Sequence, residues 1–245
     1  SAKVFGVRPG SPFLYNIAAT GERPMAFSAE GLPKGLKVDK ETGYIRGTVK
    51  KRGTYHVKLY ATNQWGKAER DLRIVVGDEI ALTPPMGWNS WNCWGLSVTQ
   101  EKVISSAKAL LEKGLADYGY AYINIDDAWE APQRNGDGTI AVNEKFPDMK
   151  GLGEWLHSQG LKFGIYSSPG DLTCGGYLGS LDHEKQDAET YNEWGIDYLK
   201  YDWCGYGRKH AKEKDNQTTA SFVRPYLLME GYLRDQPRDI FYSLC

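Results

Sequence analysis

Residues 198–204, with the sequence YLKYDWC, read as an apolar strand that ends in a carboxylate. Lys200 and Asp202 stand two positions apart, so both belong to one face of the strand. Burying charged side chains costs free energy unless they are paired or used. Polar groups that follow a strand at its carboxyl end are typical of the functional sites of parallel α/β folds. This stretch therefore predicts a buried strand with a site at its end.

Strands and helices alternate on both sides of this stretch. Strands are predicted at 87–91, 120–125, 162–166, 198–201 and 240–244, and helices at 99–113, 150–159, 184–194 and within 219–234. For the first helix, Ser97 and Gln100 fit a capping box, and Gly114 ends the helical pattern. Five strands that alternate with helices require a parallel sheet.

Polar residues follow several of these strands in turn, at 89–91, 126–127, 166–168 and 202. A doubly wound sheet concentrates its site at one switch point, whereas a (β/α)8 barrel collects the ends of all its strands around the site. We therefore expect a TIM barrel over residues 83–245. A complete barrel takes roughly 250 residues. Since the sequence stops in the fifth strand, we expect an incomplete barrel with about five of its eight strands, in a truncated chain.

Residues 1–79 show strands without a helical period. Apolar and polar residues alternate between positions 55 and 76 around a turn at 63–66, which indicates an antiparallel hairpin. About eighty residues of this kind predict a small all-β sandwich, so the chain is multidomain. The segments LPKGLKVDKETGYIRGTV and GTYHVKLYATNQWGKA resemble the immunoglobulin-like domain of bacterial surface and carbohydrate-active proteins. Exposed Trp65 or Tyr44 could bind sugar there, but we favour a spacer that packs on the next domain.

Composition narrows the class of protein. A formal net charge of -1 over 245 residues lacks the basic excess that nucleic-acid binding needs. The charge-dense run at 208–215 mixes signs and indicates a solvated loop or helix face. No apolar run approaches the roughly 18 residues of a membrane span. The first residues contain no apolar signal segment, which fits a cytosolic protein or a mature chain whose signal has been removed.

The sequence contains four cysteines and no CxxC pair of the kind that binds zinc. Cys174 and Cys204 both follow expected strand ends, so one disulfide at a common rim is as consistent with the spacing as two reduced, buried thiols.

Five blocks occur in order: TPPMGWNSWN (83–92), YINIDDAWEAPQR (122–134), KFGIYSSPGDLTCGGYLGS (162–180), GIDYLKYDWC (195–204) and IFYSLC (240–245). Together they resemble glycoside hydrolase family 27, the α-galactosidase family, and the amino-terminal module is similar to that of exported bacterial members. The resemblance implies a (β/α)8 barrel followed by a β-domain. It also implies a retaining, exo-acting hydrolase that needs no cofactor and releases terminal α-linked galactose from oligo- or polysaccharides.

By this resemblance Asp202 is the nucleophile. Lys200 would help to keep the Asp202 carboxylate ionised and would donate to a sugar hydroxyl, although a purely structural ion pair between the two is the alternative. Asp126 and Asp127 match the acidic pair that grips hydroxyls on the far side of the sugar. Two carboxylates also suit a metal, which we rank low because no further ligand lies at suitable spacing, and Asp127 could instead cap the following loop.

Other residues carry roles implied by the same match. Trp91 matches the aromatic residue on which the apolar face of the galactosyl ring packs, and Tyr166 matches a tyrosine of the site. Cys174 and Cys204 match a disulfide that shapes the pocket, with Cys174 at the substrate. That disulfide implies an oxidising compartment, so we expect a periplasmic or secreted protein.

The sequence also departs from the family pattern. Ala128 stands where many eukaryotic members have a cysteine, which leaves Cys93 without an evident partner. The acid/base aspartate of the family follows the sixth strand, beyond residue 245, so we expect the fragment to be inactive alone. The alternatives are an α-N-acetylgalactosaminidase, a β-L-arabinopyranosidase or a non-catalytic glycan-binding protein. No oligomeric state is predicted.

Overall fold

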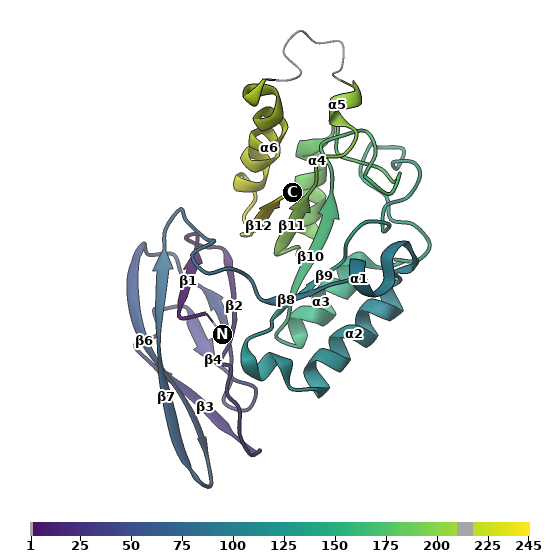
Figure 1. Cartoon of the computed structure of the whole chain (residues 1–245). Coiled ribbons are helices and arrows are strands. Elements are labelled where there is room, and N and C mark those ends of the chain that lie inside the picture. The colour runs from purple at the N-terminus through teal and green to yellow at the C-terminus, as the bar shows by residue number, and fades with distance from the viewer. Residues whose placement is uncertain (1, 210–217) are drawn as a thin grey trace. The chain divides into compact units, whose positions relative to one another are not determined.

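The computed structural model describes residues 2–209 and 218–245, and it divides into two compact units (Figure 1). One unit contains residues 1–87, 108–122 and 159–161, and the other contains residues 88–107, 123–158 and 162–245. Of the charge-dense run at 208–215, positions 210–215 lie outside the described residues.

The amino-terminal strands form two sheets of a β-sandwich. The first has the order β1-β7-β6-β3, with β1 at Val4–Val7, β3 at Ala26–Glu30, β6 at Gly53–Asn63 and β7 at Gly66–Val76. The second has the order β2-β5-β4, with β2 at Pro12–Asn16, β4 at Leu36–Val38 and β5 at Tyr44–Thr48. Apolar residues from both sheets share one core. This is the immunoglobulin-like sandwich that the strand pattern predicts.

The predicted hairpin is confirmed. Strands β6 and β7 pair antiparallel from Gly53 opposite Val76 to Asn63 opposite Gly66, which leaves two residues in the turn. Trp65 in that turn is 75% exposed, whereas Tyr44, which we expected to be exposed, is half-buried and donates its hydroxyl to the Gln159 carbonyl at 2.7 Å. Trp65 therefore stands open to solvent, and Tyr44 does not.

The strands of the carboxyl-terminal region form one five-stranded sheet with the order β12-β11-β10-β9-β8. They are β8 at Gly87–Asn89, β9 at Tyr122–Asn124, β10 at Lys162–Ser167, β11 at Tyr198–Tyr201 and β12 at Phe241–Leu244. Strand β11 pairs in parallel with both β10 and β12. Each predicted strand is present within a few residues of its expected bounds.

The helices connect these strands as the sequence pattern indicates. They are α1 at Trp91–Trp94, η1 at Gly95–Ser97, α2 at Gln100–Glu112, η2 at Leu115–Tyr118, α3 at Met149–Ser158, α4 at Glu184–Glu193, α5 at Tyr206–Lys209 and α6 at Thr219–Arg234. Among the described residues, no helix is both long enough and apolar enough to cross a membrane. The result is a partial parallel sheet with its connecting helices.

The predicted capping box of helix α2 is wrong by two residues. The Thr99 hydroxyl accepts the backbone N–H of Lys102 at 3.2 Å, so Thr99 caps this helix. Ser97 instead donates to the Trp94 carbonyl at 2.7 Å, within the preceding turn. Gly114 ends the helical region with φ of 70°, a conformation that favours glycine.

Strand β12 lies at one end of the sheet order, and the surface near it is apolar. Leu244 on β12 is 60% exposed. On helix α6, four apolar side chains are at least 42% exposed: Phe222, Val223, Leu227 and Leu228. The opposite situation holds for β10, where Phe163, Ile165 and Tyr166 are at most 2% exposed. The buried middle of the sheet positions the residues that follow its strands.

Candidate active site

Polar residues from three strand ends meet at the carboxyl edge of the sheet. Asp126 and Asp127 follow β9, Tyr166 lies near the end of β10, and Asp202 follows β11. The backbone N–H of Asp202 donates to the Ser167 carbonyl at 3.0 Å, which continues the ladder one residue past the strand. The ends of β9, β10 and β11 therefore hold these four side chains on ordered backbone.

Asp126 is the centre of a buried polar contact with Lys200. Its Oδ2 accepts the Lys200 ammonium at 2.9 Å and the Asn89 amide at 2.8 Å, and only 3% of Asp126 is exposed. Lys200 starts on β11 and passes over the Tyr166 ring of β10, with Nζ 4.9 Å from the ring centroid. Burial lowers the pKa of Lys200, but the hydrogen bond and charge of Asp126 together with the charge of Asp202 outweigh it, so the pKa is raised and the ammonium stays charged.

The alternative interpretation, a structural ion pair between Lys200 and Asp202, is wrong, because Lys200 pairs with Asp126 instead. The Lys200 ammonium bonds to Asp126, although the charge of Asp202 is near enough to favour protonated Lys200. Strand periodicity places Lys200 and Asp202 on one face, but Asp202 lies past the end of β11, where the chain leaves the strand.

The Asp127 carboxylate accepts hydrogen bonds from neutral donors. Its Oδ1 accepts the Ala128 N–H and the Thr173 hydroxyl, each at 2.8 Å, and its Oδ2 accepts the Gly175 N–H at 2.6 Å. Burial raises the pKa of Asp127, and the bonds from Thr173, Gly175 and Ala128 oppose that shift. Ala128 has φ of 85°, so the chain bends sharply directly after the carboxylate. The sequence suggests Asp127 as a cap of the loop that follows it, but apart from the Ala128 N–H its carboxylate bonds to residues 173–175 of the loop after β10.

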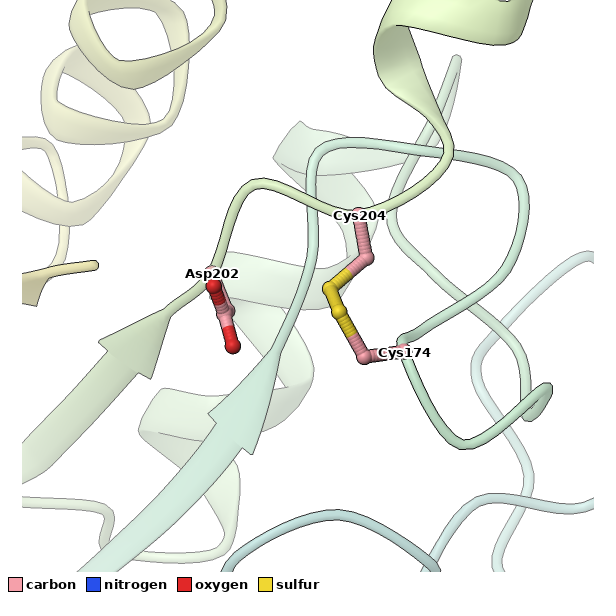
Figure 2. A group of neighbouring side chains, drawn as sticks. All are labelled: Cys174, Asp202 and Cys204. Carbon is pink, nitrogen blue, oxygen red and sulfur yellow. A yellow bond between two sulfur atoms is a disulfide. The ribbon is translucent and has the colours of Figure 1, made fainter.

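Asp202 lies beside the disulfide of Cys174 and Cys204 (Figure 2). The Tyr166 hydroxyl donates to Asp202 Oδ2 at 3.1 Å and lies 3.4 Å from Cys204 Sγ. Burial raises the pKa of Tyr166 far above its usual value, with the charges of Asp127 and Asp202 adding to the effect, so Tyr166 remains a donor. Cys174 and Cys204 form the disulfide that the family resemblance implies.

A carboxylate between two cysteines resembles a metal site in composition only. Within the described part of the chain, Cys174, Asp202 and Cys204 are the one group whose ligand atoms lie close enough for a metal, within 4.8 Å of one another. Both sulfur atoms belong to the disulfide, and a metal needs a thiolate. This group therefore offers one carboxylate and is no metal centre.

Trp91 lies at the rim of the same edge and is 44% exposed. Its backbone N–H donates to Asn89 Oδ1 at 2.8 Å, while the Asn89 amide donates to Asp126. Asn89 thus connects the Trp91 backbone to the buried Asp126 carboxylate. Sequence reasoning missed Asn89 and Thr173 as site residues, although both lie within the blocks at 83–92 and 162–180.

Hydrogen bonds and the disulfide join most of the candidate residues. Asp126 bonds to Asn89 and Lys200, and Tyr166 lies under Lys200 and bonds to Asp202. Asp127 bonds to Thr173, whose neighbour Cys174 forms the disulfide with Cys204. Hydroxyl groups of a ligand could donate to the carboxylates, while Lys200 could donate to a hydroxyl oxygen. An exposed indole beside such groups suits the C–H face of a sugar.

Comparisons with known proteins give a consistent result. Residues 83–244 match the family model described as "Alpha galactosidase A", and residues 1–77 match the model described as "Putative Ig domain". The "Alpha-galactosidase A" of Cellvibrio japonicus is 50% identical over 170 residues, which cover 69% of this chain and 39% of that protein. The "Alpha-galactosidase" of Coffea arabica is 40% identical over 183 residues, covering 74% of this chain and 46% of the coffee protein.

A solved structure from Bacteroides fragilis is similar over the whole chain. It is described as a "putative alpha-galactosidase/melibiase", is 45% identical, and has a TM-score of 0.93. The match covers 100% of this chain and 51% of the Bacteroides chain. The chain thus spans about half the length of these relatives, or less.

Proposed function

The chain belongs to the family described as alpha galactosidase A, and from that premise we propose that the whole protein is a retaining glycoside hydrolase that releases terminal α-linked galactose from oligo- or polysaccharides. Relatives named α-galactosidase, 40–50% identical to this chain, support the reaction class. The observation that carries the proposal is the placement of Asp202 at the end of β11, bonded to Tyr166 and close to Lys200, whose ammonium bonds to Asp126.

Asp202 is the proposed nucleophile. One of its oxygens attacks the anomeric carbon as the bond to the leaving oxygen breaks, and the sugar becomes an ester of Asp202. The leaving oxygen takes a proton from an acid, and water then hydrolyses the ester with that group acting as base. Tyr166 donates to Asp202 Oδ2 and leaves Oδ1 free of that bond, which supports an attacking role for Oδ1.

The remaining residues form the proposed galactose pocket. Asp126 and Asp127 accept hydroxyl protons, Lys200 donates to a hydroxyl oxygen, and Trp91 packs against the C–H face of the ring. Cys174 lines the pocket beside the nucleophile through its disulfide to Cys204. The pairing of Lys200 with Asp126 supports a joint grip on neighbouring hydroxyls, because one ligand group can accept from Lys200 while another donates to Asp126.

Three further parts of the proposal concern the whole protein. The parallel sheet is part of a (β/α)8 barrel in the domain at 83–245, and the sandwich at 1–79 is a separate domain. The acid/base group belongs to the same barrel and lies outside these residues, so the chain of 245 residues alone does not turn over substrate. The disulfide supports a periplasmic or secreted location, because disulfides persist in oxidising compartments.

The test compares the full-length protein with its Asp202→Asn variant on p-nitrophenyl α-galactoside, α-N-acetylgalactosaminide and β-L-arabinopyranoside. We expect cleavage of the α-galactoside and a loss of at least about 1,000-fold in the variant, since the nucleophile is removed. Preference for one of the other two glycosides would reassign the substrate within the family. A folded, full-length protein that cleaves none of them but binds galactose would instead be a glycan-binding protein.

A further inference from the structure

The loop between β10 and α4 forms a tight turn that displays Cys174 and Gly175. The Thr173 N–H donates to the Tyr177 carbonyl at 2.8 Å, and the Gly176 N–H donates to the Thr173 carbonyl at 3.1 Å. Leu172 and Leu178 form an isolated antiparallel bridge on either side of the turn. The turn, which we name the disulfide loop (residues 172–178), is therefore defined by its own backbone bonds.

Asp127 grips this loop from the neighbouring strand end. The Thr173 hydroxyl donates to Asp127 Oδ1 at 2.8 Å, and the Gly175 N–H donates to Asp127 Oδ2 at 2.6 Å. Asp127 and Thr173 are only 2% and 3% exposed. The Thr173 hydroxyl also accepts the Tyr177 N–H at 3.0 Å, so its single proton is committed to Asp127. Both donors to the carboxylate are thus fixed by the turn.

Gly175 makes this approach possible. A Cβ atom at Gly175 would lie 2.8 Å from Asp127 Oδ2, closer than real Cβ contacts, so a larger residue would push the carboxylate away. Cys174, between Thr173 and Gly175, forms the disulfide with Cys204, which stands two residues after Asp202. The disulfide loop therefore touches the end of β9 through hydrogen bonds and the end of β11 through a covalent bond.

We propose that Thr173 is a positioning residue: its hydroxyl fixes the Asp127 carboxylate to the disulfide loop, so that the orientation of Asp127 and the closure of the loop over Cys174–Cys204 depend on each other. Such coupling is reciprocal, because a contact that holds the loop closed is itself held by the closed loop. The value of this coupling for galactose binding rests on the proposed function, but its test does not, since the test needs no sugar.

The first readout is the reduction of the Cys174–Cys204 disulfide in the native chain by dithiothreitol. The reagent supplies two electrons and two protons, the disulfide becomes two thiols, and dithiothreitol ends as its cyclic disulfide. Alkylation and mass spectrometry of the Cys174 peptide give the rate. Cys174 is exposed and can be attacked directly, but it can separate from buried Cys204 only if the loop moves, so the rate reports how firmly Asp127 and Thr173 hold the loop.

The second readout is the titration of Asp127 itself, followed by NMR of carboxyl-labelled aspartate. The bond from Thr173 lowers the pKa of Asp127 against the effect of burial, so its removal moves this pKa upward. A threonine that merely fills space would leave the titration unchanged. The two readouts together separate positioning from packing.

The variants are Thr173→Val, which removes the hydroxyl at similar volume, and Thr173→Ser, which keeps the hydroxyl. Loss of one buried hydrogen bond predicts about tenfold faster reduction in Thr173→Val together with a raised pKa of Asp127. Thr173→Ser should stay within about twofold of the wild type in reduction rate and should retain its titration. Thr190→Val is the matched control, because Thr190 is also buried but donates to the Gln186 carbonyl within α4.

Several results would overturn the proposal. Reduction of Thr173→Val at the wild-type rate, an unchanged Asp127 titration in that variant, or a Thr173→Ser variant as fast as Thr173→Val would each do so. If Thr173→Val does not fold, the Asp127→Asn variant tests the same hydrogen bond by changing its acceptor. Its amide cannot accept both donors equally, so we expect about tenfold faster reduction, and a wild-type rate there would also contradict the proposal.

Discussion

Two buried aspartates near opposite edges of the same sheet, one before β11 and one after β9, have similar partners and different surroundings. Asp197 precedes β11, and its carboxylate accepts His157 Nε2 at 2.7 Å, the Phe163 N–H at 2.9 Å and Arg238 at 2.9 Å. Asp126 follows β9 and bonds to Lys200 at 2.9 Å. Both residues are at most 6% exposed. A buried carboxylate with a cation at 2.9 Å is therefore not in itself the mark of a functional site.

The difference lies in how the charges balance. Burial would raise the pKa of Asp197, but Lys162, His157 and Arg238 outweigh it, and the pKa of Asp197 falls well below its usual range. At the other end, three carboxylates (Asp126, Asp127 and Asp202) share a single bonded lysine among the described residues. Surplus acceptors at this edge favour a ligand with many hydroxyl donors, whereas the cluster around Asp197 is complete within the protein.

Replacing each aspartate by asparagine gives the strongest test of this contrast. Asp197→Asn removes a buried carboxylate that pairs with both His157 and Arg238, so we expect a loss of about 3–5 kcal/mol in the free energy of unfolding. Asp126→Asn should cost less, because Asp126 pairs with Lys200 alone. Urea denaturation measures both values. If Asp126→Asn loses as much stability as Asp197→Asn, the two carboxylates stabilise the fold equally and the contrast between them is wrong.

Acidification should weaken the Asp197 end first. Because the folded pKa of Asp197 is depressed, its stabilising effect is present above the unfolded pKa of about 3.9 and disappears as the pH falls through the folded value. Between pH 6 and pH 3 we expect the wild type to lose on the order of 1 kcal/mol more than Asp197→Asn. Urea midpoints at several pH values test this, and parallel curves for the two proteins would exclude Asp197 as the cause.

Lys200→Met should affect ligand binding more than folding. Removing a charged donor predicts at least about tenfold weaker galactose binding, measured by titration calorimetry on the full-length protein. Arg238→Met is the control from the other end and should leave galactose affinity within about twofold while lowering stability. If Arg238→Met weakens binding as much as Lys200→Met, the assignment of the carboxyl edge as the site is wrong.

The smallest expected effect on stability concerns Glu130, a buried carboxyl that forms no salt bridge among the described residues. It is 0% exposed, and neither side-chain oxygen has a hydrogen-bond partner among the described residues. Burial raises its pKa well above the usual value, with the charge of Asp127 adding to the shift. A raised pKa means that the protonated form stabilises the fold, and this stability is lost as the pH rises through the folded pKa.

Glu130→Gln keeps the shape and removes the titration. Because the unfolded chain loses this proton above a pKa of about 4.3, we expect equal stability with the wild type near pH 4 and at least about 1 kcal/mol more stability for the variant near pH 7. Thermal unfolding at both pH values is sufficient to measure this. A variant that is equally destabilised at both pH values would show that Glu130 has a specific partner that a neutral amide cannot replace.

Much of the fold could be predicted because strand and helix patterns are local. Strand β11 and helix α6 begin and end at the predicted residues, since an apolar strand before Asp202 and a helical stripe after Thr218 can both be read from neighbouring positions. The cap of α2 was misplaced because Ser97 and Thr99 are both good capping residues, and only the turn before the helix selects Thr99.

The site could be predicted as a set of residues but not as a set of contacts. The family resemblance identified Asp126, Asp127, Lys200 and Asp202, while the bond between Lys200 and Asp126 spans 74 positions and crosses β10. Periodicity within one strand carries no information about such a partner. The same holds for Thr173 and Asp127, which are 46 positions apart and meet only because the loop after β10 folds back over the end of β9.

Strand β12 has a practical consequence for handling the protein. It lies at the end of the sheet order, and beside it Leu244 and the outer side chains of α6 are open to solvent. A strand edge offers a row of backbone donors and acceptors that can pair with another molecule, and apolar surface adjacent to it strengthens that tendency. Concentrated solutions of the 245-residue chain should therefore self-associate through β12, and dilute samples are the conditions in which its folding and its disulfide are best measured.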